Sequence, residues 1–419
     1  MKKHTQSPYE SSEISYKPSG IEWLGEIPQS WKNVSIRSCF TESNQRCNTD
    51  SYPLLSVTIA NGIIYQDDIE NKKDISNDDK SNYKIVPLNA VAYNKMRMWQ
   101  GAVGVNTLTT GIVSPAYIVA IPNEKILPNF VSYLFKSKIM IGEFDKNSYG
   151  LCLDMNNLRY DDFRNIKIPL PPLQEQKEIA EFLDSKCEKI QNYIEKKQKL
   201  ITLLQEKKQA LINEVVTKGL NPNIEFKDSG IEYLGLIPHH WEVRRMKFMA
   251  SIHNGREQTE IADENGIYPI YGSGGILGKS MYFIYDKPSV LLGRKGTIDK
   301  PLFVEEPFWT IDTMFYTSIS KIVLPKYFYY LCLTIDFQFY ISGSAIPSMT
   351  QYDLANISFA LPPLQEQKQI ANFLDEKCEK INSAIEKTKK QIELVKEYKN
   401  TFINEAVCGR INLQKKERI

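Results

Sequence analysis

The sequence predicts an α+β protein with a duplicated, pseudo-twofold architecture: two globular domains separated by two long helices that pair as an antiparallel coiled coil. Three observations predict this fold. The stretch LPPLQEQK stands at 170–177 and again at 361–368. A block of the form SGIExLGxIPxxW precedes each half, at 19–31 and 229–241. Each octapeptide opens a long run with neither Pro nor Gly and with regular apolar spacing.

The duplication extends beyond the octapeptide, because 18 of 21 residues are identical between 170–190 and 361–381. Such similarity marks an internal repeat. The octapeptides lie 191 residues apart but the earlier blocks lie 210 apart, so the first half carries the longer insert. The inserts, roughly 32–165 and 242–356, show little similarity to each other beyond their last few residues. The repeated segments therefore form one framework that carries two different inserts. A protein that recognises two unlike ligands with one geometry needs such an arrangement.

The two long runs predict helices over 173–218 and 364–408. Prolines before and glycines after them are typical of helix ends: Pro171, Pro172 and Gly219 for the first helix, and Pro362, Pro363 and Gly409 for the second. Alternating steps of four and three select mostly apolar residues: Leu183, Cys187, Ile190, Ile194, Lys197, Ile201, Leu204, Lys208, Leu211 and Val215, then Leu374, Cys378, Ile381, Ile385, Thr388, Ile392, Val395, Lys399, Phe402 and Ala406. This 3.5-residue seam predicts a coiled coil.

An antiparallel pair within one chain fits best because a globular insert separates the helices. The alternatives are that each helix packs on its own domain, or that two chains dimerise through them. Cys187 and Cys378 lie on the seam, where we expect small apolar core residues and not reactive thiols. In the repeated octapeptide, Gln174, Glu175 and Gln176 form either a functional surface or a polar helix start that the helix dipole favours.

Composition sets limits on function. The length of 419 residues suggests two or more domains, and 42% hydrophobic with 24% charged residues is ordinary for a globular protein. No long apolar run or signal-like segment predicts a membrane or secreted protein. Seven cysteines without a CxxC and four histidines suggest neither a disulfide framework nor a zinc cluster, so a reducing cytoplasm fits best. The net charge of +2 means that any DNA-binding charge must gather on one face.

Neither insert contains a convincing catalytic constellation. The stretch YGSGGILGKS at 271–280 resembles a phosphate-binding loop, but Ser273 stands where GxxxxGK[ST] requires its first glycine. Its glycines more simply permit tight turns or close approach of the backbone to a ligand.

Basic residues beside aromatic residues and glycines recur in predicted loops, in YNKMRMWQG, LLGRKGT and HNGR. Arg, Lys and Asn side chains donate hydrogen bonds to phosphates and base edges, although each is equally consistent with a solvated loop. The segments 147–158 and 341–354 end the inserts with small polar residues that suit a sugar-phosphate backbone or a turn. The candidate DNA-binding residues are Lys95, Arg97, Trp99, Ser148, Tyr149, Arg159, His253, Asn254, Arg256, Ser273, Arg294, Lys295, Ser342 and Ser344.

Two copies of SGIExLGxIPxxW, each leading through a divergent insert to LPPLQEQK and a long helix, resemble the specificity subunit of a type I restriction-modification enzyme. The resemblance covers nearly the whole chain after residue 17. The second insert is similar to a recurrent form of that family's target recognition domain. The resemblance implies a flexible segment at 1–17, target recognition domains at 18–170 and 219–361, conserved helices at 171–218 and 362–410, and a tail at 411–419.

The resemblance further implies that each target recognition domain binds one half of a bipartite site in double-stranded DNA, and that the helix pair fixes the distance between the halves. The chain would be a non-catalytic cytoplasmic subunit. It would join two modification subunits, which methylate adenine at N6 with S-adenosylmethionine, and restriction subunits that use ATP and Mg. The sequence agrees in lacking an NPPY-like tetrapeptide and a Walker motif; Asn221, in NPNI, is only a partial likeness.

Two other functions stay open. A scaffold would bind proteins through its helices without reading DNA, and complex formation without sequence-selective DNA retention would favour it. A self-sufficient methyltransferase or nucleotide hydrolase is disfavoured by the absent motifs, and binding of S-adenosylmethionine or ATP by the isolated chain would favour it.

Overall fold

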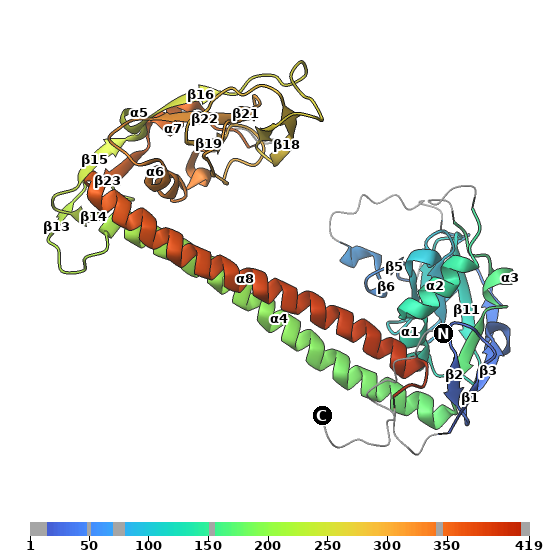
Figure 1. The fold of residues 1–419 in the computed structure, drawn as a ribbon. Coiled ribbons are helices and arrows are strands. Elements are labelled where there is room, and N and C mark those ends of the chain that lie inside the picture. Colours follow the sequence, from blue (N-terminus) through green and yellow to red (C-terminus); the bar gives the residue numbers. More distant parts are fainter. Residues whose placement is uncertain (1–14, 48–51, 70–79, 151–155, 341–346, 412–419) are drawn as a thin grey trace, which may run out of the picture. The chain divides into compact units, whose positions relative to one another are not determined.

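The chain folds into two compact units, each with one globular domain and part of both long helices (Figure 1). The computed structural model describes residues 15–47, 52–69, 80–150, 156–340 and 347–411. The first unit comprises 1–196 with 391–419, and the second comprises 197–390. Helices α4 (Leu173–Lys218) and α8 (Leu364–Val407) each run through both units. The predicted α+β fold with a duplicated frame is confirmed.

The globular domain of each unit is built from short strands and short helices. The first contains β1 Tyr16–Pro18, β2 Glu26–Pro28, β3 Lys32–Ser35, β4 Phe40–Ser43, β5 Leu55–Thr58, β6 Gly62–Tyr65, β7 Lys84–Val86, β8 Val91–Asn94, β9 Val103–Val105, β10 Gly111–Val113, β11 Tyr117–Pro122, α1 Pro128–Lys136, α2 Lys138–Lys146, α3 Tyr160–Phe163 and β12 Lys167–Leu170. The second contains β13 Phe226–Asp228, β14 Leu236–Pro238, β15 Glu242–Arg245, α5 Met246–Met249, β16 Ala250–Asn254, β17 Tyr268–Gly272, β18 Gly275–Ser280, β19 Ser289–Gly293, β20 Leu302–Val304, β21 Trp309–Thr310, β22 Met314–Ile319, α6 Pro325–Cys332, α7 Gln351–Asn356 and β23 Ser358–Leu361.

Both domains contain the same four-stranded antiparallel sheet, with the order β4-β11-β8-β9 in the first and β16-β22-β19-β20 in the second. The two inserts therefore share a central sheet although they share little sequence. Buried strand positions accept many apolar residues, so the sheet persists where sequence identity does not. The domains differ in what surrounds this sheet. The first adds the pairs β5-β6 and β7-β10, and the second adds the sheet β18-β17-β21.

Each domain's core is completed by the start of one long helix and the end of the other. The first core includes Ile179 and Leu183 of α4 with Ala406 and Val407 of α8. In the second core, Ile212, Val215 and Val216 of α4 lie with Ile370, Ala371 and Leu374 of α8. Apolar contacts of this kind stabilise a helix that its own propensity would not hold in water.

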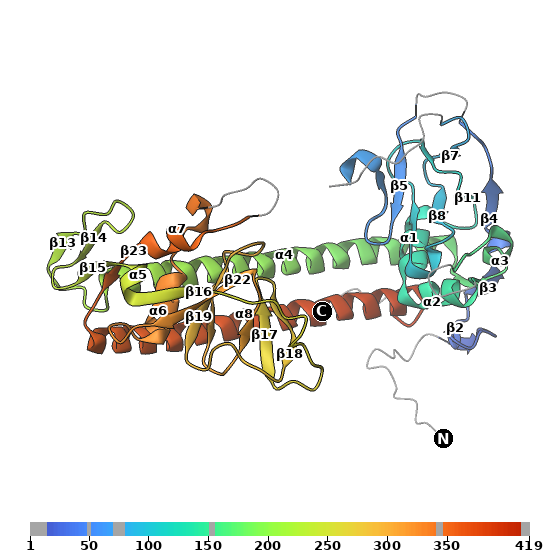
Figure 2. The same ribbon diagram turned by 90° about the horizontal axis from the view of Figure 1, so that it is seen from above.

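The helices α4 and α8 pack together as an antiparallel pair (Figure 1), and they lie side by side again in the turned view of Figure 2. In the first unit the rings of Phe182 and Phe402 lie 5.4 Å apart. In the second, Lys208 Nζ donates to Asn382 Oδ1 at 3.0 Å. All the predicted seam positions are buried or half-buried. The predicted antiparallel pairing is confirmed, and α8 ends one residue before its predicted limit.

The repeated glutamines Gln176 and Gln367 join each domain to its helix. Both side chains are fully buried. Gln176 Oε1 accepts from the N–H of Leu127 at 2.7 Å, and its Nε2 donates to two backbone carbonyls. Gln367 repeats this pattern, with 2.8 Å to the N–H of Leu324. Because Leu127 and Leu324 cap α1 and α6 without a side-chain bond of their own, the glutamine satisfies a helix end.

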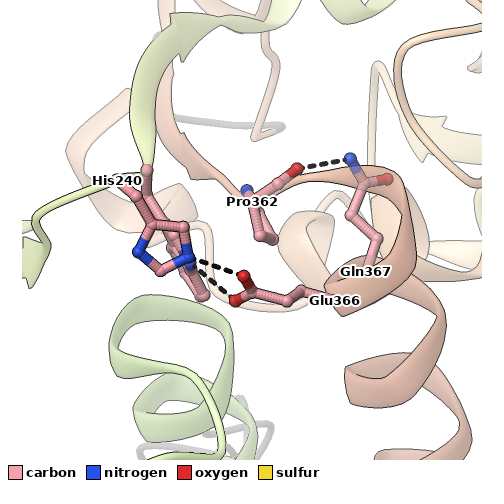
Figure 3. Close-up of polar contacts among 5 residues, drawn as sticks. His240, Pro362, Glu366 and Gln367 are labelled. Carbon is pink, nitrogen blue, oxygen red and sulfur yellow. Dashed lines mark hydrogen bonds and ion pairs between the residues drawn. The ribbon is translucent and has the colours of Figure 1, made fainter. Parts of the chain in front are cut away.

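The repeated tryptophans complete this connection. Trp31 Nε1 donates to Glu175 at the start of α4 at 2.6 Å, and its ring lies against Gly409 just beyond the end of α8. Trp241 Nε1 donates to Glu366 at 3.0 Å, beside His240 Nε2 at 2.6 Å (Figure 3), and its ring lies against Gly219.

We call Trp31, Glu175 and Gln176 the first helix clamp, and Trp241, Glu366 and Gln367 the second. Each clamp holds the start of one long helix beside the end of the other. Gln176 and Gln367 are therefore buried structural contacts and not part of an exposed surface. Gln174 is exposed, and its side chain donates to Glu178 one turn along the helix. Cys187 is half-buried and Cys378 buried, and burial raises the pKa of both thiols, as expected for core residues.

Candidate nucleic-acid interface

Most of the candidate residues in the second domain gather where the central strand β22 begins and its neighbours β16 and β19 end. The antiparallel register pairs Asn254 with Phe315 and Gly293 with Met314, so both neighbouring strands run out at the same place. We call this place the loop end of the sheet; it comprises residues 254–256 and 293–296 in the second domain.

Three candidates, Asn254, Arg294 and Lys295, line one surface pocket of about 370 Å³ at this loop end. Ser348, Thr350 and Gln351, which follow the 341–346 segment, line its other side. The pocket combines cations with neutral donors and acceptors, which is the mixture that phosphate and base-edge contacts require.

Arg294 is held by its backbone and by its side chain. Its N–H donates to the carbonyl of Thr313 at 2.9 Å, and its carbonyl accepts from the N–H of Met349 at 3.0 Å. Its Nη1 donates to the carbonyl of Asp312 at 3.1 Å, and the guanidinium lies 6.0 Å from the ring centre of Phe315. An arginine fixed in this way loses less conformational entropy on binding a ligand than a free one.

Ser273 joins the same loop end. Its N–H donates to Thr313 Oγ1 at 3.4 Å. Its Oγ lies 3.1 Å from where a Cβ on Gly296 would stand, and Gly296 has φ +83°. A side chain there would be strained and crowded, which explains the glycine that follows Lys295.

His253 lies on the opposite face of the sheet from Asn254, because successive residues of a strand alternate. Its ring stacks on Tyr316 at 4.9 Å, and its Nε2 lies 2.8 Å from Ser318 Oγ. The structure thus places His253 against neighbouring strand residues, and Asn254 in the pocket. Arg256 is exposed, and its N–H donates to the carbonyl of Thr310 at 2.8 Å.

In the first domain, Lys95, Arg97 and Trp99 form a turn directly after β8. Lys95 is half-buried, Arg97 is exposed, and the Trp99 indole donates to the carbonyl of Met96 at 3.1 Å. The carbonyl of Lys95 accepts from the N–H of Leu158 at 2.8 Å, so this turn is joined to the end of the 147–158 segment.

The remaining candidates of the first domain lie along that segment. Ser148 Oγ donates to the carbonyl of Phe144 at 2.7 Å, which closes the end of α2. Tyr149 is 68% exposed and pairs with Asn157 through two backbone hydrogen bonds. Arg159 is exposed just before α3. Ser342 and Ser344 lie outside the described residues.

Lys95 and Arg294 occupy equivalent positions in the two domains. Each is the first residue after the second strand in chain order of its central sheet, β8 or β19, because Asn94 pairs with Tyr117 as Gly293 pairs with Met314. Each also offers its carbonyl to the backbone of the returning segment, at Leu158 and Met349.

The equivalence of the two sheets adds two candidate DNA-binding residues that were not predicted from the sequence, Asn44 and Arg46. β4 pairs with β11 as β16 pairs with β22, so Ser43 corresponds to His253 and Arg46 to Arg256. A signal was present in the sequence: SNQR at 43–46 matches HNGR at 253–256 at the 210-residue offset of the first repeated block. Arg46 is exposed, and its Nη1 donates to Asn82 Oδ1 at 2.8 Å.

In the first domain, the corresponding loop end of the central sheet holds Arg46 and Lys95. Lys84, on β7, is a further cation near these two residues. It is 7% exposed, and burial is the main cause that lowers its pKa below the usual range. Glu42 opposes this shift, whereas the positive charges of Lys95 and Arg46 add to it. The three cations are therefore close enough to interact, and they form a positively charged cluster.

Among the described residues, no carboxylate lies within ion-pair distance of the cations of either loop end, although Glu42 acts on Lys84 from farther away. Within the described ranges, no ion pair involves Arg46, Lys84, Lys95, Arg256 or Arg294. The described part of the chain also contains no cluster of His, Cys, Asp and Glu that would hold a metal ion. Cations grouped at a loop end give a local positive field in a chain of nearly balanced charge.

The chain thus has two globular domains on an antiparallel helix pair, and each domain groups cations at one end of its central sheet. This arrangement is typical of a duplicated protein with two recognition domains. The family model for the type I restriction modification DNA specificity domain matches residues 30–205 and again 238–394. The chain belongs to this family, and it is a type I restriction-modification specificity subunit with two such domains. Subunits of this kind recognise DNA and are non-catalytic.

Individual relatives agree. The chain is 28% identical over 339 residues to the type I restriction enzyme MjaVIII specificity subunit of Methanocaldococcus jannaschii. The aligned region covers 73% of this chain and 75% of that protein. A chain from a solved structure concerned with complex assembly and conformational transition of the type I R-M system has a TM-score of 0.70 at 15% identity, over 92% of this chain and 99% of that chain.

The HsdS subunit from Thermoanaerobacter tengcongensis has a TM-score of 0.51 at 17% identity, over 92% of this chain and 98% of that one. These two likenesses support the fold. None of the helices in the described residues is long and apolar enough to cross a membrane.

Proposed function

We propose that each globular domain reads one half of an asymmetric, bipartite site in double-stranded DNA through the loop end of its central sheet. The observation that carries this proposal is the matched pair of loop ends. The same sheet presents cations at equivalent positions, Lys95 and Arg294, within different surroundings. The equal positions of these cations suit the sugar-phosphate backbone, which is the same in both half-sites. The different residues around them suit two half-sites that differ in base sequence.

The antiparallel helix pair sets the spacer between the half-sites. A helix rises 1.5 Å per residue, so a continuous pair of fixed length serves as a ruler along the duplex. The duplicated frame also presents two equivalent docking surfaces, one for each of two modification subunits, because pseudo-twofold protein symmetry matches the dyad of DNA.

The partners supply the chemistry. Modification subunits would methylate adenine at N6 with S-adenosylmethionine, and restriction subunits would use ATP and Mg. This chain would bind none of these cofactors itself, and its part is to place the methylating subunits at a chosen sequence.

The test is to express the chain with its cognate modification subunit and to map methylated adenines on random DNA. We expect one adenine in each of two different half-sites separated by a spacer of constant length and variable sequence. Methylation without sequence preference would refute the reading function. It would favour the alternative that the chain is a coiled-coil scaffold that assembles proteins without reading DNA.

A further inference from the structure

The two loop ends contain some side chains at equivalent positions and others without a counterpart, and these two kinds of side chain suit different parts of the DNA. Two readers of unlike half-sites share one feature of their ligand, the sugar-phosphate backbone. A cation that stands at the same register position in both loop ends therefore suits the shared feature, and side chains there without a counterpart suit the bases that differ.

Two pairs of cations meet this condition. Arg46 and Arg256 follow the first strand of the central sheet, in the matching motifs SNQR and HNGR. Lys95 and Arg294 follow the strand on the other side of the middle strand. The members of a pair are both basic although their domains have few other residues in common at these loop ends.

The backbone at both arginines is anchored in a neighbouring strand. Arg46 forms an isolated antiparallel bridge with Lys84 of β7, and the N–H of Arg256 donates to the carbonyl of Thr310 in β21. Both side chains are exposed. An anchored backbone with an exposed side chain holds a charge at a fixed place, as recognition of a phosphate requires.

We propose that Arg46 with Lys95, and Arg256 with Arg294, form one phosphate-binding pair in each domain, which positions the DNA backbone in the same way at both half-sites without reading sequence. This assignment rests on the proposed function. By the same reasoning, Lys84, Lys295 and Ser273 have no equivalent in the other loop end and belong to the domain-specific surroundings.

The test uses the full chain in complex with its modification subunit. The affinity for a duplex that carries the mapped site and for an unrelated duplex is measured by fluorescence anisotropy over a series of salt concentrations, for the wild type, R46Q, R256Q and the double variant. Each single variant should weaken binding to both duplexes by about tenfold. The slope of log affinity against log salt should fall by about 1 for each single variant and about 2 for the double variant.

Matched controls come from the turns that precede the same strands. Arg37 and Lys247 are exposed cations that precede β4 and β16, at the opposite end from Arg46 and Arg256. R37Q and K247Q should leave affinity and slope unchanged. R46K and R256K, which keep the charge, should retain the wild-type slope and show that the glutamine variants act through charge and not through misfolding.

Methylation mapping separates this proposal from the reading function itself. R46Q, R256Q and the double variant should methylate the wild-type sequence, only more slowly, and the control variants at the wild-type rate. If R46Q or R256Q changed the base preferred at any position, or left the salt slope unchanged, the phosphate assignment would be overturned while the reading function stood. A wild-type complex that methylates without sequence preference would overturn the reading function, whatever the variants did.

Discussion

At the scale of single residues, two buried glutamines hold the globular domains on the helix pair. Gln367 and Gln176 each make three hydrogen bonds with backbone groups of their own unit, at 2.7 to 3.0 Å. A buried amide with these partners cannot be shortened without leaving an N–H and two carbonyls unsatisfied. This is a physical reason for two identical copies of the octapeptide.

We expect Gln367→Ala to lower the free energy of unfolding by about 2–4 kcal/mol, because several buried polar groups lose their partner. Gln365→Ala, at an exposed position two residues earlier, should change it by less than about 0.5 kcal/mol. Urea denaturation of the two variants and the wild type measures both values. Equal effects at the two positions would show that the buried hydrogen bonds do not stabilise the fold.

Tyr133 and Tyr330 make a second repeated contact, since each hydroxyl donates to an aspartate of the long helix, Asp184 or Asp375, at 2.6 Å. Burial first, and then the hydrogen bond to the aspartate, raises the pKa of each tyrosine above its usual value. The unfolded chain therefore loses these protons at lower pH than the folded chain. The stability that the contacts supply is fully present below about pH 10 and is lost as the pH rises further.

Tyr330→Phe should accordingly destabilise the protein by about 1 kcal/mol at pH 8. The difference from the wild type should shrink between about pH 10 and pH 12. Denaturation curves of the two proteins across this range measure it. A difference that stays constant above pH 10 would contradict the proposed origin of the shift.

Sequence reasoning at this scale found the repeats but not their contacts. Gln176 bonds Leu127, 49 residues earlier, and Trp31 bonds Glu175 across 144 residues. Such pairings follow from the tertiary fold, which spacing along the chain does not show. Arg46 was missed for a different reason: its four-residue match to HNGR was too short to stand out before the strand register made the two positions equivalent.

At the scale of elements, the long helices were the most predictable part of the chain. Proline and glycine at their ends, and an apolar period of 3.5, are local signals, and α4 spans Leu173–Lys218 as expected. The central sheets were the least predictable. Their strands are three to six residues long and their neighbours are distant in sequence, so no local period reveals that both inserts share one sheet.

The helix pair allows a prediction about the spacer. Inserting seven residues into α4 after Lys196 and seven into α8 after Lys390 keeps the seam in register and lengthens the pair by about 10 Å. We expect the spacer to grow by about three base pairs, with both half-sites unchanged. Mapping of methylated adenines measures this. A control insertion in α4 alone should abolish the effect, and a changed half-site would refute the ruler.

At the scale of the whole molecule, each domain with its clamp is a self-consistent module. The second unit comprises the continuous segment 197–390, and the first closes around the same kind of clamp. Because Trp31 and Trp241 make the same contact with equivalent glutamates, the frame does not depend on which insert it carries.

We therefore expect that replacing the first insert, roughly 32–165, by a copy of the second, roughly 242–356, gives a chain that still folds and assembles. The pseudo-twofold frame would then carry two identical readers, and the target should become an inverted repeat of the former second half-site. Methylation mapping of the chimaera is the measurement, with the wild type as control. An unchanged asymmetric target would show that the inserts do not carry the sequence preference.

The division of the chain has a consequence for synthesis. The first domain's core includes Ala406 and Val407, and the Trp31 ring lies against Gly409, but the whole second unit, 197–390, is synthesised before those residues. During synthesis the second unit can therefore fold completely while part of the first domain's apolar core is still exposed. The half that is made first is completed last.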